Sequence, residues 1–491
     1  NLATKGVNIL GVNQTGAANT AGTISVSSTL ADITVKSAGT GIVGKNNINV
    51  SSGKGLTLES AGSALLYSVT GNITLSSVGN MSVGLVGTTS TNDAIYSAGN
   101  LSLTSSAGTL TLSDSILSTG AGNTITLSSQ GAMSTFGLSA NGNIALTSSA
   151  GTITLGDSVV STAGGISVNA SGNASLRLLQ AAADVSVVSG GAISSQLGSG
   201  VRLIDSASGR ALLDATQGVG TSSVAIVTRV ASLSLRNTTS GGIFVNEQDG
   251  ATLTAIDGTV TSSVVSGGSS GVVALTLDSG DLTVNGAITS TATAGHVFLG
   301  ATLGNITVNQ QINSAHGHVT INAKQNLTLD ATAASSRTGG IVLAETTVDR
   351  NIELVSQLGS LIMTAGALLD TSAHSGAIRL TSSQNVQLGK VRAGTGTVSI
   401  KATSGSVTLA ASSSGNAVTA GKLRIEAATG VGIDVTPTPA VIQAITTDVA
   451  SLAVSTSSGG VFITEASGLI LDSIAAATVG VVDAAGVLTS S

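Results

Sequence analysis

Two copies of one stretch decide the fold: Gly99-Asn100-Leu101-Ser102-Leu103-Thr104-Ser105-Ser106-Ala107-Gly108-Thr109-Leu110-Thr111-Leu112 and, further along the chain, Gly142-Asn143-Ile144-Ala145-Leu146-Thr147-Ser148-Ser149-Ala150-Gly151-Thr152-Ile153-Thr154-Leu155. Each copy contains two apolar-polar-apolar triplets, one near its start and one at its end. In a β-strand, alternate side chains point to the same face. Ile144 and Leu146 therefore point inward and Ala145 points outward, so each copy predicts two short strands that share one buried side.

The triplets continue along the chain at a nearly constant spacing. From Leu275 onward, apolar positions also recur at one equal interval, at Val297, Val319 and Ile341. We interpret the distance between the two quoted copies as two coils of about 22 residues each. First triplets begin at Ile24, Ile48, Ile73, Leu101, Ile125, Ile144, Ile166 and Val185; second triplets begin at Ile33, Leu56, Met81, Leu110, Met133, Ile153, Ala174 and Ile193; a third apolar spot follows at Ile42, Leu65, Ile116, Leu138 and Val159.

This period predicts an all-β fold, a right-handed parallel β-solenoid (β-helix) with about 22 residues per coil and roughly 22 coils. Gly, Asn and Asp fill the corners between triplets, where the backbone needs a positive φ. An antiparallel sandwich would not keep this register, and the Gly, Ser and Thr content disfavours helices. We expect residues 1–491 to form one continuous solenoid segment of a longer protein.

The composition excludes several classes of protein. The 491 residues include 64 Gly, 2 Pro and no Cys, with only 9% charged and 1% aromatic residues and a net charge of −6. Without Cys there are no disulfides and no thiolate ligands for zinc. Without a Lys/Arg cluster or aromatic platforms, we expect no nucleic-acid partner. No apolar run is as long as the roughly 18 residues that a spanning helix needs, so we expect no membrane-spanning segment.

A second self-similarity has a much longer period. The sequence Val230-Ala231-Ser232-Leu233, followed by Ser240-Gly241-Gly242-Ile243-Phe244-Val245-Asn246-Glu247, matches Val449-Ala450-Ser451-Leu452, followed by Ser458-Gly459-Gly460-Val461-Phe462-Ile463-Thr464-Glu465. We predict related units at 230–256 and 449–475. Irregular corner excursions are expected before them, near 205–229 and 426–448, the latter holding Pro437 and Pro439.

The Gly-Asn-apolar-Thr/Ser-Leu triplets and this longer unit resemble giant bacterial surface proteins similar to filamentous haemagglutinin. The resemblance covers essentially the whole chain and rests on repeats and composition. It implies an exported adhesin, matrix fibre or surface coat. The chain departs from that family in lacking an N-terminal two-partner secretion module with its Asn-Pro-Asn motif and a C-terminal membrane barrel.

Three histidines are weak candidates for a metal site. His296 and His318 are separated by one predicted coil and each precedes a triplet, so we expect them to stack one coil apart, with His316 close by. Neighbouring imidazoles can bind a metal ion. The alternative is that they are solvent-facing corner residues. Since no carboxylate is close in sequence, we predict no metal and no cofactor; a fourth histidine is His374.

We predict no catalytic residues. Asp278 and Asp281 lie close together, and a lyase on a solenoid would need several such acids with an Arg or Lys on one face; we expect instead salt bridges along a polar rim. Asn-x-Ser/Thr triplets begin at Asn72, Asn100, Asn305 and Asn326, and a Gly-Asn corner followed by a strand creates them automatically. The densest charged region comprises Asp205, Arg210, Asp214, Arg229, Arg236, Glu247 and Asp249.

The predicted function is that of an extracellular or cell-surface structural and adhesive rod, not an enzyme. Its expected partners are a cell surface, extracellular matrix or other copies of itself. Two alternatives stay open: a self-assembling filament or sheath subunit, and a carbohydrate-binding or depolymerising solenoid of the lyase or tailspike kind.

Overall fold

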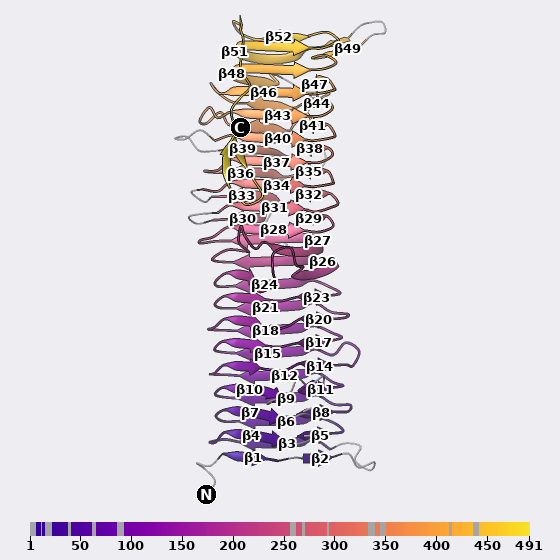
Figure 1. Cartoon of the computed structure of the whole chain (residues 1–491), viewed down its shortest axis with the longest axis vertical. Helices are drawn as coiled ribbons and strands as arrows, with labels where there is room; N and C mark the ends of the chain where they lie inside the picture. Colours follow the sequence, from indigo (N-terminus) through magenta and orange to yellow (C-terminus); the bar gives the residue numbers. More distant parts are fainter. Residues whose placement is uncertain are drawn as a thin grey trace. The chain divides into compact units, whose positions relative to one another are not determined.

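The computed structural model describes residues 6–10, 12–14, 22–37, 41–60, 65–85, 93–255, 262–267, 271–291, 294–331, 339–343, 350–411, 415–435 and 441–491. All regular secondary structure within these ranges is β-strand, and nearly all strand pairs are parallel (Figure 1). The chain divides into two compact units, Asn1–Thr216 and Gln217–Ser491. The all-β parallel solenoid predicted from the triplets is confirmed; its handedness stays a prediction.

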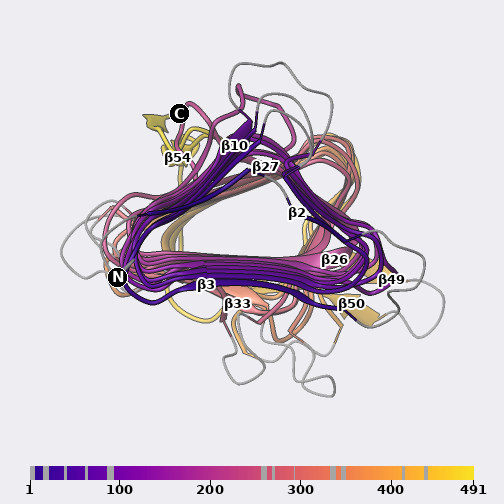
Figure 2. The same cartoon turned by 90° about the horizontal axis from the view of Figure 1, so that it is seen from below.

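In the first unit, each coil contributes one strand to each of three parallel stacks, which give the coil a triangular outline (Figure 2). The first stack contains β3 (Ile24–Ser28), β6 (Ile48–Ser52), β9 (Ile73–Ser77), β12 (Leu101–Ser105), β15 (Ile125–Ser129), β18 (Ile144–Ser148), β21 (Ile166–Ala170) and β24 (Val185–Ser189). The second contains β1 (Val7–Ile9), β4 (Ile33–Ser37), β7 (Leu56–Ser60), β10 (Met81–Leu85), β13 (Leu110–Leu112), β16 (Met133–Thr135), β19 (Ile153–Leu155), β22 (Ala174–Leu176) and β25 (Ile193–Ser195). The third contains β2 (Val12–Gln14), β5 (Ile42–Gly44), β8 (Leu66–Ser68), β11 (Ile95–Ser97), β14 (Ile116–Ser118), β17 (Leu138–Ala140), β20 (Val159–Ser161) and β23 (Leu179–Ala181), and β26 (Ile204–Ala215) extends from this stack to the first.

The triplets predicted from the sequence are the rungs of these stacks. Ile24 lies opposite Ile48, and Leu101 lies between Ile73 and Ile125. The step along the chain varies, because it is longer from Ile73 to Leu101 than from Leu101 to Ile125. The corners between strands vary in length from coil to coil, and the strands still keep their register.

The second unit repeats the three stacks with longer coils. Its first stack contains β28 (Ile243–Glu247), β31 (Val273–Leu277), β34 (Val297–Ala301), β37 (Val319–Ala323), β40 (Ile352–Ser356), β43 (Ile378–Ser382) and β46 (Thr397–Ala402). Its second contains β29 (Ala251–Leu253), β32 (Leu282–Val284), β35 (Ile306–Val308), β38 (Leu327–Leu329), β41 (Leu361–Met363), β44 (Val386–Leu388) and β47 (Val407–Leu409). Its third contains β30 (Ser262–Ser266), β33 (Ala287–Ser290), β36 (Gln311–Ser314), β39 (Gly340–Leu343), β42 (Leu368–Asp370) and β45 (Lys390–Arg392). Three long strands, β27 (Ile226–Asn237), β48 (Val418–Ala427) and β51 (Ile445–Thr456), each run across a corner and belong to more than one stack.

One predicted register is wrong. The positions at 275, 297, 319 and 341 do not form a single column, although Val297 does stack on Val319. Leu275 stacks on Leu299, Val319 stacks on Ile352 after a much longer coil, and Ile341 belongs to another stack, opposite Ile312. A uniform coil length therefore overstates the regularity of this unit.

The two predicted excursions differ from each other. Most of 205–229 is strand, because β26 covers Ile204–Ala215 and β27 begins at Ile226. In 426–448, a two-stranded antiparallel hairpin of β49 (Ile433–Val435) and β50 (Val441–Gln443) does leave the stacks. Pro437 and Pro439 lie outside the described residues.

The interior is filled by small aliphatic side chains, and side-chain hydrogen bonds link the corners of successive coils. Asn72 Oδ1 accepts a hydrogen bond from the Asn100 amide at 2.8 Å, and Asn100 Oδ1 accepts one from the Thr124 amide at 2.8 Å. Buried serines at strand ends donate across coils, as Ser118 Oγ does to the Gly99 carbonyl at 2.8 Å. Polar groups at the corners are thus satisfied by the next coil, which fixes the stacking register.

Candidate interaction surface

The last coil of the second unit is incomplete. Strand β51 pairs on one side with β48. On the other side it pairs with β52 (Ile463–Glu465), through Ile445 and Ile463, and with β53 (Ile470–Leu471), through Ser451 and Ile470. Among the described residues, no strand pairs with Val454–Thr456 on this second side. Val454–Thr456, which stack on Ile425–Ala427, therefore form an unpaired half-rung at this end of the described chain.

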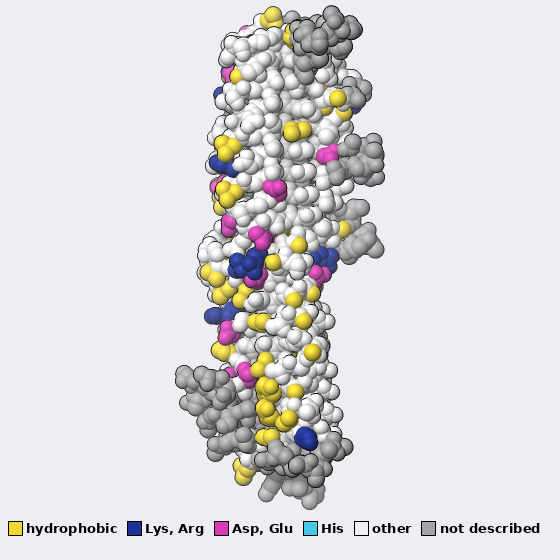
Figure 3. Space-filling model, turned by 90° about the vertical axis from the view of Figure 1, so that its right-hand side faces the viewer, with side chains coloured by type: hydrophobic (Ala, Val, Ile, Leu, Met, Phe, Trp, Pro, Cys, Tyr) yellow, Lys and Arg dark blue, Asp and Glu magenta, His cyan; other side chains and the backbone are white. Residues whose placement is uncertain are grey.

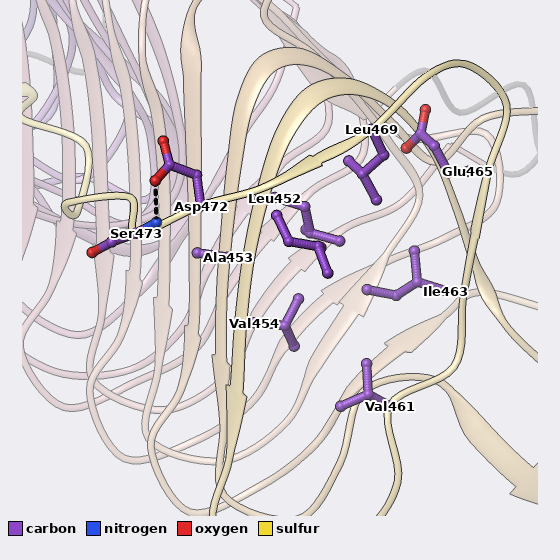
Figure 4. Close-up of a pocket in the computed structure, with 10 residues that line it drawn as sticks. Leu452, Ala453, Val454, Val461, Ile463, Glu465, Leu469, Asp472 and Ser473 are labelled. Atoms are coloured by element: carbon purple, nitrogen blue, oxygen red, sulfur yellow. Dashed lines mark hydrogen bonds between the residues drawn. The ribbon is translucent and has the colours of Figure 1, made fainter.

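A cavity of about 760 Å³ lies at this open position. Figure 4 shows aliphatic side chains around it, with the carboxylates of Glu465 and Asp472 far from each other. Ile470 and Leu471 are 63% and 78% exposed, which is unusual for side chains of this size on a strand. The lining residues are Leu452, Ala453, Val454, Val461, Ile463, Glu465, Leu469, Leu471, Asp472 and Ser473.

The earlier copy of the same unit shows what covers such a surface. Strand β27 pairs with β28 and β29 as β51 pairs with β52 and β53. In addition, its Leu235 lies opposite Val264 of β30, and both side chains are fully buried. The cavity beside Val454 therefore occupies the position that β30 fills in the earlier copy.

A buried glutamate of the earlier copy has a counterpart in the later one. Glu247 Oε2 accepts a hydrogen bond from Thr228 Oγ1 at 2.5 Å, and Oε1 accepts one from the Val230 amide at 3.2 Å. In the later copy, Glu465 accepts the same two bonds from Thr447 Oγ1 at 2.7 Å and from the Val449 amide at 3.0 Å. The carboxylate holds the first bend of the long strand in both places. The sequence comparison matched the glutamates but missed the threonines, which the same offset would have found.

The two glutamates titrate in opposite directions. Burial raises the pKa of Glu247 to about 8, against the hydrogen bond from Thr228, and the Asp249 side chain raises this pKa further. Burial also acts to raise the pKa of Glu465, but hydrogen bonds from Thr447, Val449 and Ser467 outweigh it and lower the pKa. The difference follows from the coils stacked over Glu247 and absent over Glu465.

Residues 472–491, here called the C-terminal strap, turn away from the last coil and run back along the outside of the first stack. The strap includes an antiparallel hairpin of β54 (Gly480–Val482) and β55 (Leu488–Ser490), seen in yellow beside the stacks in Figure 2. The Ala477 amide donates to Ser399 Oγ at 2.6 Å and the Val482 amide donates to Thr320 Oγ1 at 2.9 Å. Val482 packs on Ala274 and Phe298, side chains that point outward from β31 and β34.

The covered side chains form one column along the first stack. We call this column the outer column; its side chains change from apolar to charged along the stack. The strap covers them, so outward positions of these strands are buried. Glu353 and Arg379 form an ion pair within it, and Arg379 also donates to the Ser491 carbonyl at 2.7 Å. The column runs in register through Phe244, Ala274, Phe298, Thr320, Glu353, Arg379 and Ser399.

The histidines take the place of corner asparagines. As expected, His296 and His318 lie one coil apart, with ring centroids 5.3 Å apart. His296 Nδ1 accepts from the His318 amide at 3.1 Å and His318 Nδ1 accepts from the Asn351 amide at 3.2 Å. Burial, together with nearby Arg350, lowers the pKa of His296, and burial and neighbouring positive groups lower the pKa of His318 to about 4.

These bonds leave each ring only Nε2 as a further ligand atom. Across the described part of the chain, which includes His316, no group of three or more His, Asp or Glu side chains is placed to hold a metal ion. His374 Nε2 lies 2.8 Å from the Arg350 carbonyl. The rings of His296 and His318 thus bond one corner to the next, as the corner asparagines do.

The acids singled out in the sequence also serve the corners. Asp281 Oδ1 accepts from the Asn305 amide at 2.8 Å, and the Asp278 amide donates to the Glu247 carbonyl. In the densest charged region, Asp205 pairs with Arg202 at 2.9 Å. Asn305 and Asn326 of the Asn-x-Thr triplets accept amides of the next coil, as Asn72 and Asn100 do.

Half-buried apolar side chains also reach the surface along the third stack of the first unit (Figure 3). Tyr67 and Tyr96 stack there with centroids 4.8 Å apart and an interplanar angle of 13°. Val43 and Leu117 continue this outward row on either side. Because the rings stack on each other, their faces are turned away from any ligand that approaches from solvent.

Comparison with known proteins found no matching family model, no similar curated protein and no similar solved structure. Within the described residues, no helix is long and apolar enough to cross a membrane.

Proposed function

We propose that this chain is part of an extracellular structural and adhesive rod of a bacterial surface, similar in kind to filamentous haemagglutinin. Its role is mechanical: stacked coils span distance and present corners and outward side chains to a partner surface. The proposed partners are another cell, extracellular matrix or further copies of the chain, and the proposed activity requires no catalytic group.

The observation that carries this proposal is the continuous bonding between coils. Every stack is a parallel ladder, and the Asn and Ser side chains add a second set of bonds between the same coils. In a solenoid these bonds point along the stacking direction, so each coil is bonded to its neighbours along its strands and at its corners.

A specific observation favours self-assembly as the second candidate. The last coil exposes Ile470 and Leu471 and leaves strand edges unpaired among the described residues. Exposed edges of this kind pair readily with another chain. Assembly of copies would extend a rod and would not conflict with adhesion.

Immunogold labelling of intact cells of the producing organism tests the first proposal. Antibodies raised against this segment should decorate the outside of unpermeabilised cells, and external protease should remove the signal. Labelling only after permeabilisation would refute a surface role. Single-molecule stretching of the purified segment should give high rupture forces, whereas extension at forces typical of random coil would refute a load-bearing one.

A further inference from the structure

The cavity beside Val454 has the features of a strand-acceptor site. It is lined by Leu452, Val454 and Ile463, and it lies next to a strand edge that no described strand pairs with. An unpaired edge presents backbone donors and acceptors that an added strand can satisfy. Its ligand is therefore an extended segment that places one apolar side chain inward, as Val264 of β30 does in the earlier copy.

The chain carries a segment that fits. The distance along the sequence from Leu253 to Val264 equals the distance from Leu471 to Val482. Val482 therefore has the same reach from β53 that Val264 has from β29. The next residue, Asp483, would then point outward to solvent, where its charge is tolerated.

We propose that the C-terminal strap has two alternative positions, the observed one on the outer column and a second one in which Gly480–Val482 fills the cavity as the third strand of the last coil. In the second position Val482 lies opposite Val454. This inference does not depend on the proposed function; in the second position Val454 of β51 gains the partner that it lacks in the first.

Side chains, not a backbone ladder, hold the strap in the observed position. The Ala477 and Val482 amides donate to the hydroxyls of Ser399 and Thr320. Arg424 and Arg379 donate to the Ile474 and Ser491 carbonyls. Burial of Val482 against Ala274 and Phe298 opposes release. The cavity offers an aliphatic lining together with an unpaired backbone edge, so the two positions compete for one segment.

Cysteine pairs test the proposal, because the chain contains no Cys. Val482→Cys with Thr320→Cys reports the observed position, and Val482→Cys with Val454→Cys reports the cavity position. Val482→Cys with Leu358→Cys, an exposed residue, measures random encounter. Each protein is oxidised and the initial rate of intramolecular disulfide formation is measured by denaturing electrophoresis and peptide mass spectrometry.

Both reporter pairs should form disulfides faster than the Leu358 control. Ser399→Ala removes one bond of the strap and should raise the rate of the Val454 pair about fivefold, since a lost hydrogen bond is worth about this population change. A Val454 pair no faster than the control overturns the proposal. A disulfide between two chains also overturns it, because a second copy would then supply the strand. If Val454→Cys prevents folding, Ser455→Cys with Asp483→Cys tests the same register at exposed positions.

Discussion

The two equivalent glutamates give opposite pH dependences in one molecule. Glu247 is fully buried, and its pKa is raised to about 8 from an ordinary value of 4.5. Below pH 4.5 both the folded and the unfolded carboxyl are protonated. Above pH 4.5 only the unfolded state loses its proton, so stability falls as the pH rises towards 8. At about 1.4 kcal/mol per pKa unit, the loss is about 5 kcal/mol above pH 8, of which about 3 kcal/mol is gone by pH 7.

Glu247→Gln removes this dependence, because an amide does not titrate. The assay is native-state hydrogen exchange by mass spectrometry on peptides covering β28 and β29, with intrinsic rates corrected for pH. Local opening suits a solenoid better than a global midpoint, since coils unfold as coupled neighbours. The protection of these peptides should fall between pH 5 and 8 in the original chain and stay flat in the variant.

Glu465→Gln is the matched control. The pKa of Glu465 is lowered, so its stabilisation is present above pH 4.5 and is lost as the pH falls below that value. This variant should reduce protection of β52 at neutral pH and leave the alkaline loss at β28 unchanged. An identical pH profile for Glu247→Gln and the original chain would refute the assignment of the alkaline loss to Glu247.

Three further outcomes follow from the same structure. Leu103→Ala, at a fully buried rung, should cost about 2–5 kcal/mol of local opening free energy, measured by hydrogen exchange of β12; a cost below about 1 kcal/mol would contradict tight stacking. Gly304→Ala places a methyl group 1.7 Å from the Gly280 carbonyl oxygen and should destabilise that corner in urea unfolding, whereas Gly198→Ala, with open space around it, should not. His318→Asn keeps a side-chain acceptor for the Asn351 amide and should be nearly neutral at pH 7. Because the pKa of His318 is lowered to about 4, the original chain should lose stability as the pH falls from 6.5 to 4, and thermal melts of His318→Asn should show a smaller loss, with the share of His296 remaining.

The rungs were predictable because they depend on residue order alone. Leu101 and Ile125 stack since a strand places alternate side chains on one face, whatever the corner between them. The same reasoning failed at Val319 and Ile341, where a longer coil moves the second residue to another stack. The number of residues between two apolar positions depends on the length of the corners as well as on the strands. Equal spacing therefore does not show that two residues stack; the strand pairing in the structure does.

The candidate site was predicted only in part. The longer repeat aligned Glu247 with Glu465, and both accept the same pair of hydrogen bonds, but the sequence could not show that a further strand pairs over Glu247 and none of the described strands over Glu465. The histidines were placed one coil apart, and their hydrogen bonds to the His318 and Asn351 amides were not foreseen, because a ring in a corner can accept a bond or bind an ion.

The sequence by itself determined the class of fold, the inward and outward alternation and the positions of most strands in the first unit. These follow from local rules, because strand periodicity and corner residues act within a few positions of each other. The tertiary structure alone decided that part of β51 has no partner strand among the described residues and where the last residues of the second unit lie. Val482 meets Thr320 across a separation of 162 in the sequence, and the choice between that contact and the cavity beside Val454 depends on packing free energies that no local pattern contains.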